Sequence, residues 1–207
     1  MRQSMTRRDL LRLGAAGLAG TVFLVDAVRA SASGRVARVS SLLPEVQEAA
    51  REYGVPVPVL LAMGYVNTRL EMPASEVTAY REGDPEGRGM YGLMALVRNP
   101  AADTVGLAAR ITRLSPRELM SDRSANLHGG AALLAYSQGP GRPRLARDWL
   151  GAVAGTGGDG PALHATAGVG GGDLYADQVA DVLARGFTVR TSSGERLALA
   201  AQEVGSR

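Results

Sequence analysis

The residues best suited to chemistry lie in the stretch YVNTRLE, residues 65–71. It places the amide of Asn67 four positions before the carboxylate of Glu71, one turn along the same face if the helix persists. A carboxylic acid can act as a general acid when an apolar environment raises its pKa. An amide can only donate and accept hydrogen bonds. Glu71 is therefore the candidate acid/base, and Asn67 is a candidate ligand-holding group.

A second candidate stretch, GMYGLM, follows at residues 89–94. Tyr91 offers an aromatic face and Met94 a pliable apolar wall, both of which suit a sugar ring. The alternative interpretation is that these side chains pack in the core and touch no ligand, and it applies more to Met94 than to Tyr91. Gly89 and Gly92 belong to the same turn, and we include them with Asn67 among the candidate ligand-binding residues.

Other catalytic classes lack the residues that they need. The chain contains no cysteine and two histidines, His128 and His164. A thiol nucleophile, a Ser-His-Asp triad or a cysteine-bearing zinc site is therefore not expected, and neither is a bound metal or cofactor. Three more carboxylates precede GMYGLM in a loop rich in Pro and Gly, where they are either solvated charges or partners of the site: Glu76, Asp84 and Glu86.

Apolar residues at helical spacing predict that helices position both stretches. Ser115-Pro116-Arg117-Glu118 has the residues of a capping box, with Ser at the cap and Glu three positions later. The polar end of the chain predicts at most one small hairpin around Ser193-Gly194. We expect an all-α domain of about six helices with long loops. The expected helical segments are residues 42–54, 55–70, 102–114, 124–138, 145–154 and 172–186.

Several motifs together resemble the lysozyme-like fold of soluble lytic transglycosylases and goose-type lysozymes. Those families end a helix with Glu-Ser and later carry a Gly-x-x-Gly-Leu-Met-Gln turn. The chain is also similar to the N-terminal lysozyme-like module of secreted actinobacterial N-acetylmuramoyl-L-alanine amidases, through an LSP-type cap and two later helices. The matching stretches are Asn67-Thr68-Arg69, Gly89 to Ala95, Leu114-Ser115-Pro116, Ser124 to Ala135, and Asp148 to Ala154.

The resemblance implies a domain that holds peptidoglycan glycan strands, yet it places Asn67 where the families carry their catalytic Glu. We therefore expect a glycan-binding domain with impaired catalysis. One alternative is an active muramidase or lytic transglycosylase that uses Glu71 as its acid/base. Another is a truncated interaction module that docks a separate cell-wall amidase. A zinc amidase is not expected, because its metal site needs several His with Cys or Asp ligands, and this chain has two His and no Cys.

The N-terminal residues have the composition of an export signal. Paired Arg7 and Arg8 precede an apolar run and a small-residue cleavage site near Ala32, which suggests the twin-arginine route. The run is too short for a stable membrane anchor. Cleavage would leave 18 basic and 18 acidic residues, so no basic excess remains for nucleic acid. We expect a secreted or wall-associated protein with a signal at 1–32, a linker at 33–41, a helical domain at 42–186 and a short tail at 187–207.

Overall fold

The computed structural model describes residues 42–83, 88–155 and 171–204. The expected signal and linker therefore lie outside the described residues, as do Asp84, Glu86 and His164.

The helices are α1 (Leu42–Tyr53), α2 (Val57–Thr68), α3 (Ser75–Thr78), α4 (Thr104–Thr112), α5 (Pro116–Ser121), α6 (Arg123–Gln138), the 3₁₀ helix η2 (Ala146–Trp149), α7 (Leu150–Val153) and α8 (Gly171–Arg185). The strands are β1 (Met90–Tyr91), β2 (Leu96–Asn99), β3 (Ala102–Asp103), β4 (Phe187–Arg190) and β5 (Arg196–Leu199).

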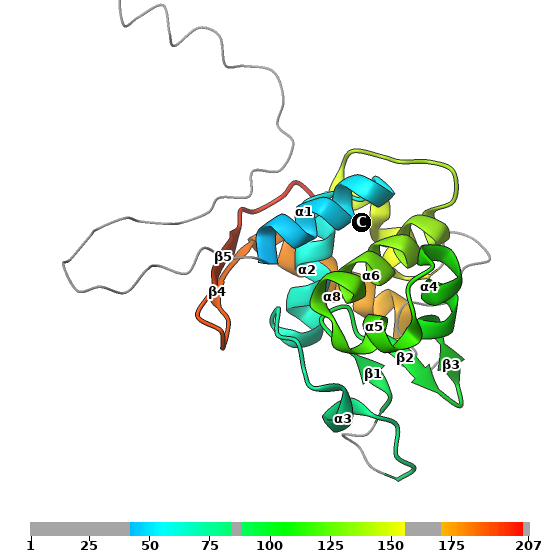
Figure 1. Cartoon of the computed structure of the whole chain (residues 1–207). Coiled ribbons are helices and arrows are strands. Elements are labelled where there is room, and N and C mark those ends of the chain that lie inside the picture. The colour runs from blue at the N-terminus through cyan, green and yellow to red at the C-terminus, as the bar shows by residue number, and fades with distance from the viewer. Residues whose placement is uncertain (1–41, 84–87, 156–170, 205–207) are drawn as a thin grey trace, which may run out of the picture.

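The expectation of an all-α fold is wrong. The described residues form eight α-helices and two small antiparallel sheets, one of three strands in the order β1-β2-β3 and one of two strands, β4-β5. The strands have between two and four residues each. Segments this short show no alternating apolar pattern that a sequence could reveal, because their pairing is fixed by turns and by packing. In Figure 1 the two sheets lie on different sides of the helical body.

Helix α6 lies at the centre of the fold and contacts α1, α4, α5 and α7. Its glycines let neighbouring side chains come very close. A Cβ added at Gly130 would lie 2.6 Å from Met94, and one at Gly129 would lie 2.7 Å from Leu119. The Gly-rich part of α6 therefore receives side chains from the turn before β2 and from α5.

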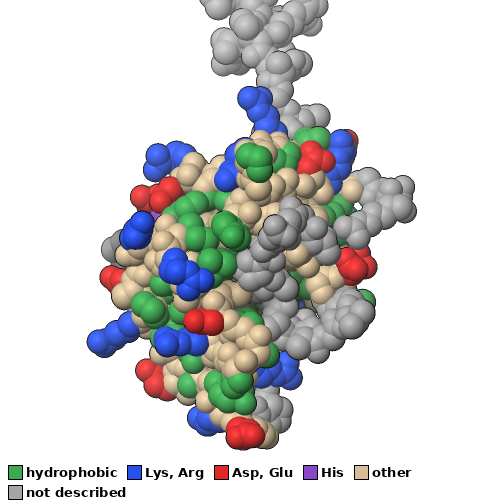
Figure 2. Space-filling model, turned by 90° about the vertical axis from the view of Figure 1, so that its right-hand side faces the viewer, with side chains coloured by type: hydrophobic (Ala, Val, Ile, Leu, Met, Phe, Trp, Pro, Cys, Tyr) green, Lys and Arg blue, Asp and Glu red, His purple; other side chains and the backbone are tan. Residues whose placement is uncertain are grey.

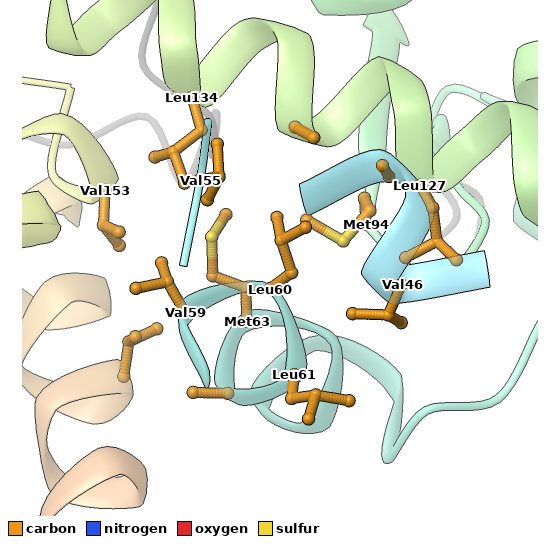
Figure 3. Packing of buried hydrophobic residues seen from close by; sticks show 14 of the residues in the cluster. Val46, Val55, Val59, Leu60, Leu61, Met63, Met94, Leu127, Leu134 and Val153 are labelled. Carbon is orange, nitrogen blue, oxygen red and sulfur yellow. The ribbon is translucent and has the colours of Figure 1, made fainter. Parts of the chain in front are cut away.

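The core is a continuous cluster of aliphatic side chains around α2 and α6. Figure 3 shows Val59, Leu60 and Met63 of α2 among side chains from α1, α6, α7 and the turn that carries Met94. All three α2 residues are at most 1% exposed. Burying this much apolar surface is the main driving force for the fold, and it fixes the position of the last turn of α2.

Several local predictions are confirmed. Ser115 Oγ accepts from Glu118 N at 3.2 Å, and a Glu118 carboxylate oxygen accepts from Ser115 N at 2.8 Å, which completes the capping box of α5. The small hairpin around Ser193 and Gly194 is present as β4 and β5, with Phe187 opposite Leu199 and Arg190 opposite Arg196. The capping box and the hairpin turn each depend on residues close together in the sequence, so they can be predicted without knowledge of distant contacts.

The C-terminal hairpin packs onto the helices and contributes to the core. Leu197 and Leu199 of β5 are each 3% exposed. The Arg123 guanidinium on α6 pairs with Glu45 of α1, at 2.7 Å from Nε and 2.9 Å from Nη2, and with Glu195 beside β5 at 3.4 Å. A planar guanidinium can hold two carboxylates in this way, so one side chain joins α1, α6 and the hairpin.

None of the helices in the described parts of the chain is both long and apolar enough to cross a membrane. On the face shown in Figure 2, basic and acidic side chains are interspersed among apolar ones.

Candidate functional site

The candidate site is built on the last turn of α2. The helix ends because Arg69 adopts a left-handed conformation, with φ 57° and ψ 32°. The N–H of Arg69 donates to Tyr65 O at 3.0 Å and that of Leu70 donates to Gly64 O at 3.1 Å. These bonds satisfy carbonyls of the last helical turn that have no partner further along the helix. Asn67 therefore lies on a rigid helical turn whose end is sharply defined.

Asn67 faces the turn of GMYGLM, as the sequence predicts that it should if the two stretches share a site. Its Nδ2 donates to Leu93 O at 3.4 Å across 26 positions of the chain. Its Oδ1 is buried and has no hydrogen-bond partner among the described residues. An unpaired buried acceptor costs about 1–3 kcal/mol, and the neighbouring phenol of Tyr175 is a donor that can lower this cost.

Tyr175 of α8 lies next to Asn67. No pattern in the sequence predicts this contact, because the two residues are far apart in the chain. The Tyr175 side chain is 6% exposed. Its burial raises the pKa of the phenol well above its ordinary value, and hydrogen bonding with the Asn67 side chain offsets part of that rise. Tyr175 and Asn67 together present a phenol and an amide, which bind through hydrogen bonds but supply no acid strong enough to protonate a sugar oxygen near neutral pH.

The turn of GMYGLM is held by Asn126 of α6. Asn126 is fully buried, accepts from Met94 N at 2.7 Å and donates to Tyr91 O at 3.0 Å and Leu119 O at 2.8 Å. Gly92 has φ 69°, and a Cβ added there would lie 2.3 Å from the Asn126 side chain. A side chain at position 92 would therefore collide with the group that fixes the turn.

The other predicted binding residues of this turn lie deeper than a ligand-lining position suggests. Met94 is 2% exposed and packs in the core, and Tyr91 is 8% exposed. Gly89 has φ 69°, and a Cβ there would lie 2.4 Å from Arg98 O. Gly89 and Gly92 thus permit close backbone approach, while Met94 supports the turn from below.

Glu71 lies beyond the end of α2 and is held by the C-terminal hairpin. One of its carboxylate oxygens accepts from Ser192 N at 2.6 Å and the other from Ser192 Oγ at 2.7 Å, across 121 positions of the chain. Thr68 Oγ1 also donates to Glu71 O at 2.8 Å. Both side-chain oxygens therefore already accept a bond, so Glu71 anchors the hairpin turn and is poorly placed to give a proton to a ligand.

An aromatic stack lies beside the site. Tyr65 of α2 stacks on Phe187 of β4 with ring centroids 4.2 Å apart and planes 9° apart, and the Arg69 guanidinium carbon lies 4.3 Å from the Tyr65 ring centroid. No local pattern predicts this stack, because its two rings are distant in the chain. Of the loop carboxylates in the described part, Glu76 accepts from Ser75 Oγ at 3.3 Å on the exposed α3.

Within the described ranges no group of three or more His, Asp or Glu side chains could hold a metal ion. Searches with family models, curated proteins and solved structures found no match to this chain. The chemistry of the site is therefore argued from its own residues.

Raising the pH is expected to unfold the protein partly through Tyr175. The folded state holds the phenol proton above pH 10, where the unfolded chain releases it, so stability is present below that pH and is lost above it. Between pH 9 and pH 11 the loss from this one group is about 1.4 kcal/mol. Chemical denaturation at pH 9 and pH 11 measures the free energy of unfolding. Its decline between the two pH values should be smaller in Tyr175→Phe than in the unchanged protein.

Tyr136 provides the matched control for that measurement. It is 51% exposed on α6. Tyr136→Phe is therefore expected to lose as much unfolding free energy between pH 9 and pH 11 as the unchanged protein does. An equal reduction in both variants would contradict the role given to the buried phenol. Tyr53 adds to the decline in all three proteins, since burial, then the neighbouring Glu52, raises its pKa to about 12.

Proposed function

We propose that this chain is an exported domain that binds peptidoglycan glycan strands at the junction of α2 and the GMYGLM turn, without cleaving them. The observation that supports it best is the identity of the group at that junction. Asn67 stands on the last turn of α2, contacts the GMYGLM turn through Leu93 O, and lies beside the phenol of Tyr175. An amide in this place can bind a sugar's acetamido or hydroxyl group, but it cannot protonate a leaving oxygen.

The proposal of impaired catalysis is supported by what surrounds Asn67. Its near neighbours are the phenol of Tyr175 and the carbonyl of Leu93. Glu71, the only carboxylate of YVNTRLE, has both oxygens occupied by Ser192. An enzyme that uses Glu71 would first have to release the hairpin from it, so the active muramidase is the weaker proposal.

Sedimentation with purified, insoluble peptidoglycan tests the binding proposal. The full chain is expected to co-sediment, and Asn67→Ala is expected to bind about fivefold more weakly, since one net hydrogen bond is worth about 1 kcal/mol. Asn99→Ala is the control, because it removes the same kind of side chain, whose three hydrogen bonds hold the β2-β3 turn away from this junction. Failure of the full chain to co-sediment would overturn the proposal and favour a module that docks an amidase.

A cleavage assay separates the binding domain from the active enzyme. The full chain is expected to release no reducing ends or anhydro sugars from the same wall preparation. If sugars are released and Glu71→Gln abolishes their release, the enzyme proposal replaces the binding one.

A further inference from the structure

We infer that Arg69 binds a carboxylate of the wall polymer, so that this site selects acidic peptidoglycan over neutral glycans. The inference rests on the proposed function and adds to it the chemical class of ligand. It concerns a residue that follows Asn67 by two positions on the same helix end. Three features of Arg69 support it: a guanidinium placed over an aromatic ring, a left-handed backbone, and a hydrogen-bonding edge without an ion pair among the described residues.

The guanidinium of Arg69 is held in one place by the aromatic stack. Its central carbon lies 4.3 Å from the Tyr65 ring centroid, while Phe187 stacks on Tyr65 at 4.2 Å. A free arginine side chain loses rotamer entropy when a ligand orders it. The contact with Tyr65 already restricts Arg69, so a ligand that binds it meets a smaller entropic cost.

The backbone of Arg69 is in a region that glycine adopts at low cost. Arg69 has φ 57°, and the next residue, Leu70, has φ 66°. Two consecutive left-handed residues with side chains are strained, and such strain is concentrated at functional sites. A glycine at position 69 would end α2 with less strain but would remove the cation over Tyr65.

The hydrogen-bonding edge of Arg69 is available to a ligand. Arg69 is exposed, and no carboxylate among the described residues forms an ion pair with it. Glu71, the nearest acid in sequence, is bonded to Ser192 through both oxygens. A guanidinium stacked on a ring keeps its planar N–H fork free, and that fork matches a carboxylate in a bidentate arrangement.

The charge of Arg69 decides which polymer suits this helix end. A peptidoglycan unit carries amide groups and carboxylates, whereas chitin carries the amide groups alone. A cation without an ion pair among the described residues fits the first of these polymers better than the second.

A purely structural role for Arg69 makes a different prediction. A cation over an aromatic ring at a helix C-terminus stabilises the fold by itself. In that case its replacement would lower stability and would weaken binding to every glycan alike. The experiment therefore compares polymers that differ in their carboxylates.

Binding of the full chain is measured on three polymers. The first is intact peptidoglycan, whose free carboxylates are on the stem peptides. The second is the same wall stripped by an amidase, whose free carboxylates are on the lactyl groups. The third is chitin, which has none. Arg69→Gln is expected to weaken binding to the first or the second about fivefold at low salt, and less at high salt, while binding to chitin is unchanged.

Arg113→Gln is the matched control. Arg113 is also an exposed arginine at a helix C-terminus with a left-handed backbone, at φ 66°, and it has no aromatic ring beneath it in the described structure. Arg69→Lys should fall between Arg69→Gln and the unchanged protein, because lysine keeps the charge and loses the planar fork. Thermal unfolding of each variant separates lost binding from lost stability.

Each result bears on one proposal. A loss confined to intact wall assigns the carboxylate to the stem peptide, and a loss confined to stripped wall assigns it to the lactyl group. Equal losses on all three polymers, or a loss no larger than that of Arg113→Gln, overturn the role of Arg69 and leave glycan binding in place. Failure of the unchanged protein to bind any of the three overturns the proposed function itself.

Discussion

Asn126→Ala is expected to lower the free energy of unfolding by about 3 kcal/mol or more. The side chain is fully buried and makes three hydrogen bonds, two of them to the GMYGLM turn. Its removal leaves the N–H of Met94 and the carbonyls of Tyr91 and Leu119 buried without their partner, and each such group costs about 1–3 kcal/mol. Chemical denaturation monitored by the fluorescence of Trp149 measures the change.

Asn99→Ala is the control for Asn126→Ala. Asn99 also makes three hydrogen bonds with main-chain atoms, to Arg88 O and from the N–H groups of Ala101 and Ala102, but the site is open to solvent. Water can replace a bond there, so we expect a loss of about 1 kcal/mol. Equal losses in the two variants would show that Asn126 is not the group that fixes the turn.

Gly92→Ala is expected to destabilise the protein by a similar amount, about 3 kcal/mol. Two costs combine. Alanine at φ 69° is strained by about 1 kcal/mol, and its Cβ would lie 2.3–2.6 Å from the buried Asn126 side chain, which has no room to move. Because the turn carries Leu93 O toward Asn67, peptidoglycan binding should weaken together with stability.

Gly194→Ala isolates the cost of the backbone alone. Gly194 has φ 89° in the hairpin turn, and nothing lies within 4 Å of the position that a Cβ would take. This variant is expected to lose about 1 kcal/mol. If Gly194→Ala costs as much as Gly92→Ala, steric contact with Asn126 is not the cause.

The double variant Gly92→Ala/Asn126→Ala tests the contact directly. With Asn126 shortened, the atoms that the new Cβ would strike are gone, so Gly92→Ala should cost only its backbone strain. The sum of the single losses is therefore expected to exceed the loss in the double variant by about 1–2 kcal/mol. Strict additivity would place the two residues in independent parts of the fold.

What the sequence alone determined is local. Apolar spacing and the capping box of Ser115 and Glu118 predict α1, α2, α4, α5, α6 and α8, because each signal acts within one or two helical turns. The short α3, in a segment expected to be a loop, was not predicted. The hairpin at Ser193 and Gly194 follows from turn residues in the same way. The sequence also indicated that Asn67 and the GMYGLM turn belong together, which the bond to Leu93 O agrees with.

Tertiary structure decided the fold class and the role of most site residues. The strands pair over so few residues that packing, not a repeating pattern, creates them. Glu71 meets Ser192 and Tyr65 meets Phe187 only because the chain brings its C-terminal hairpin back against α2. Whether Glu71 can donate a proton depends on its partners, and those partners lie far away in sequence. A local pattern can show which chemical group is present, but burial and distant hydrogen bonds determine what that group is free to do.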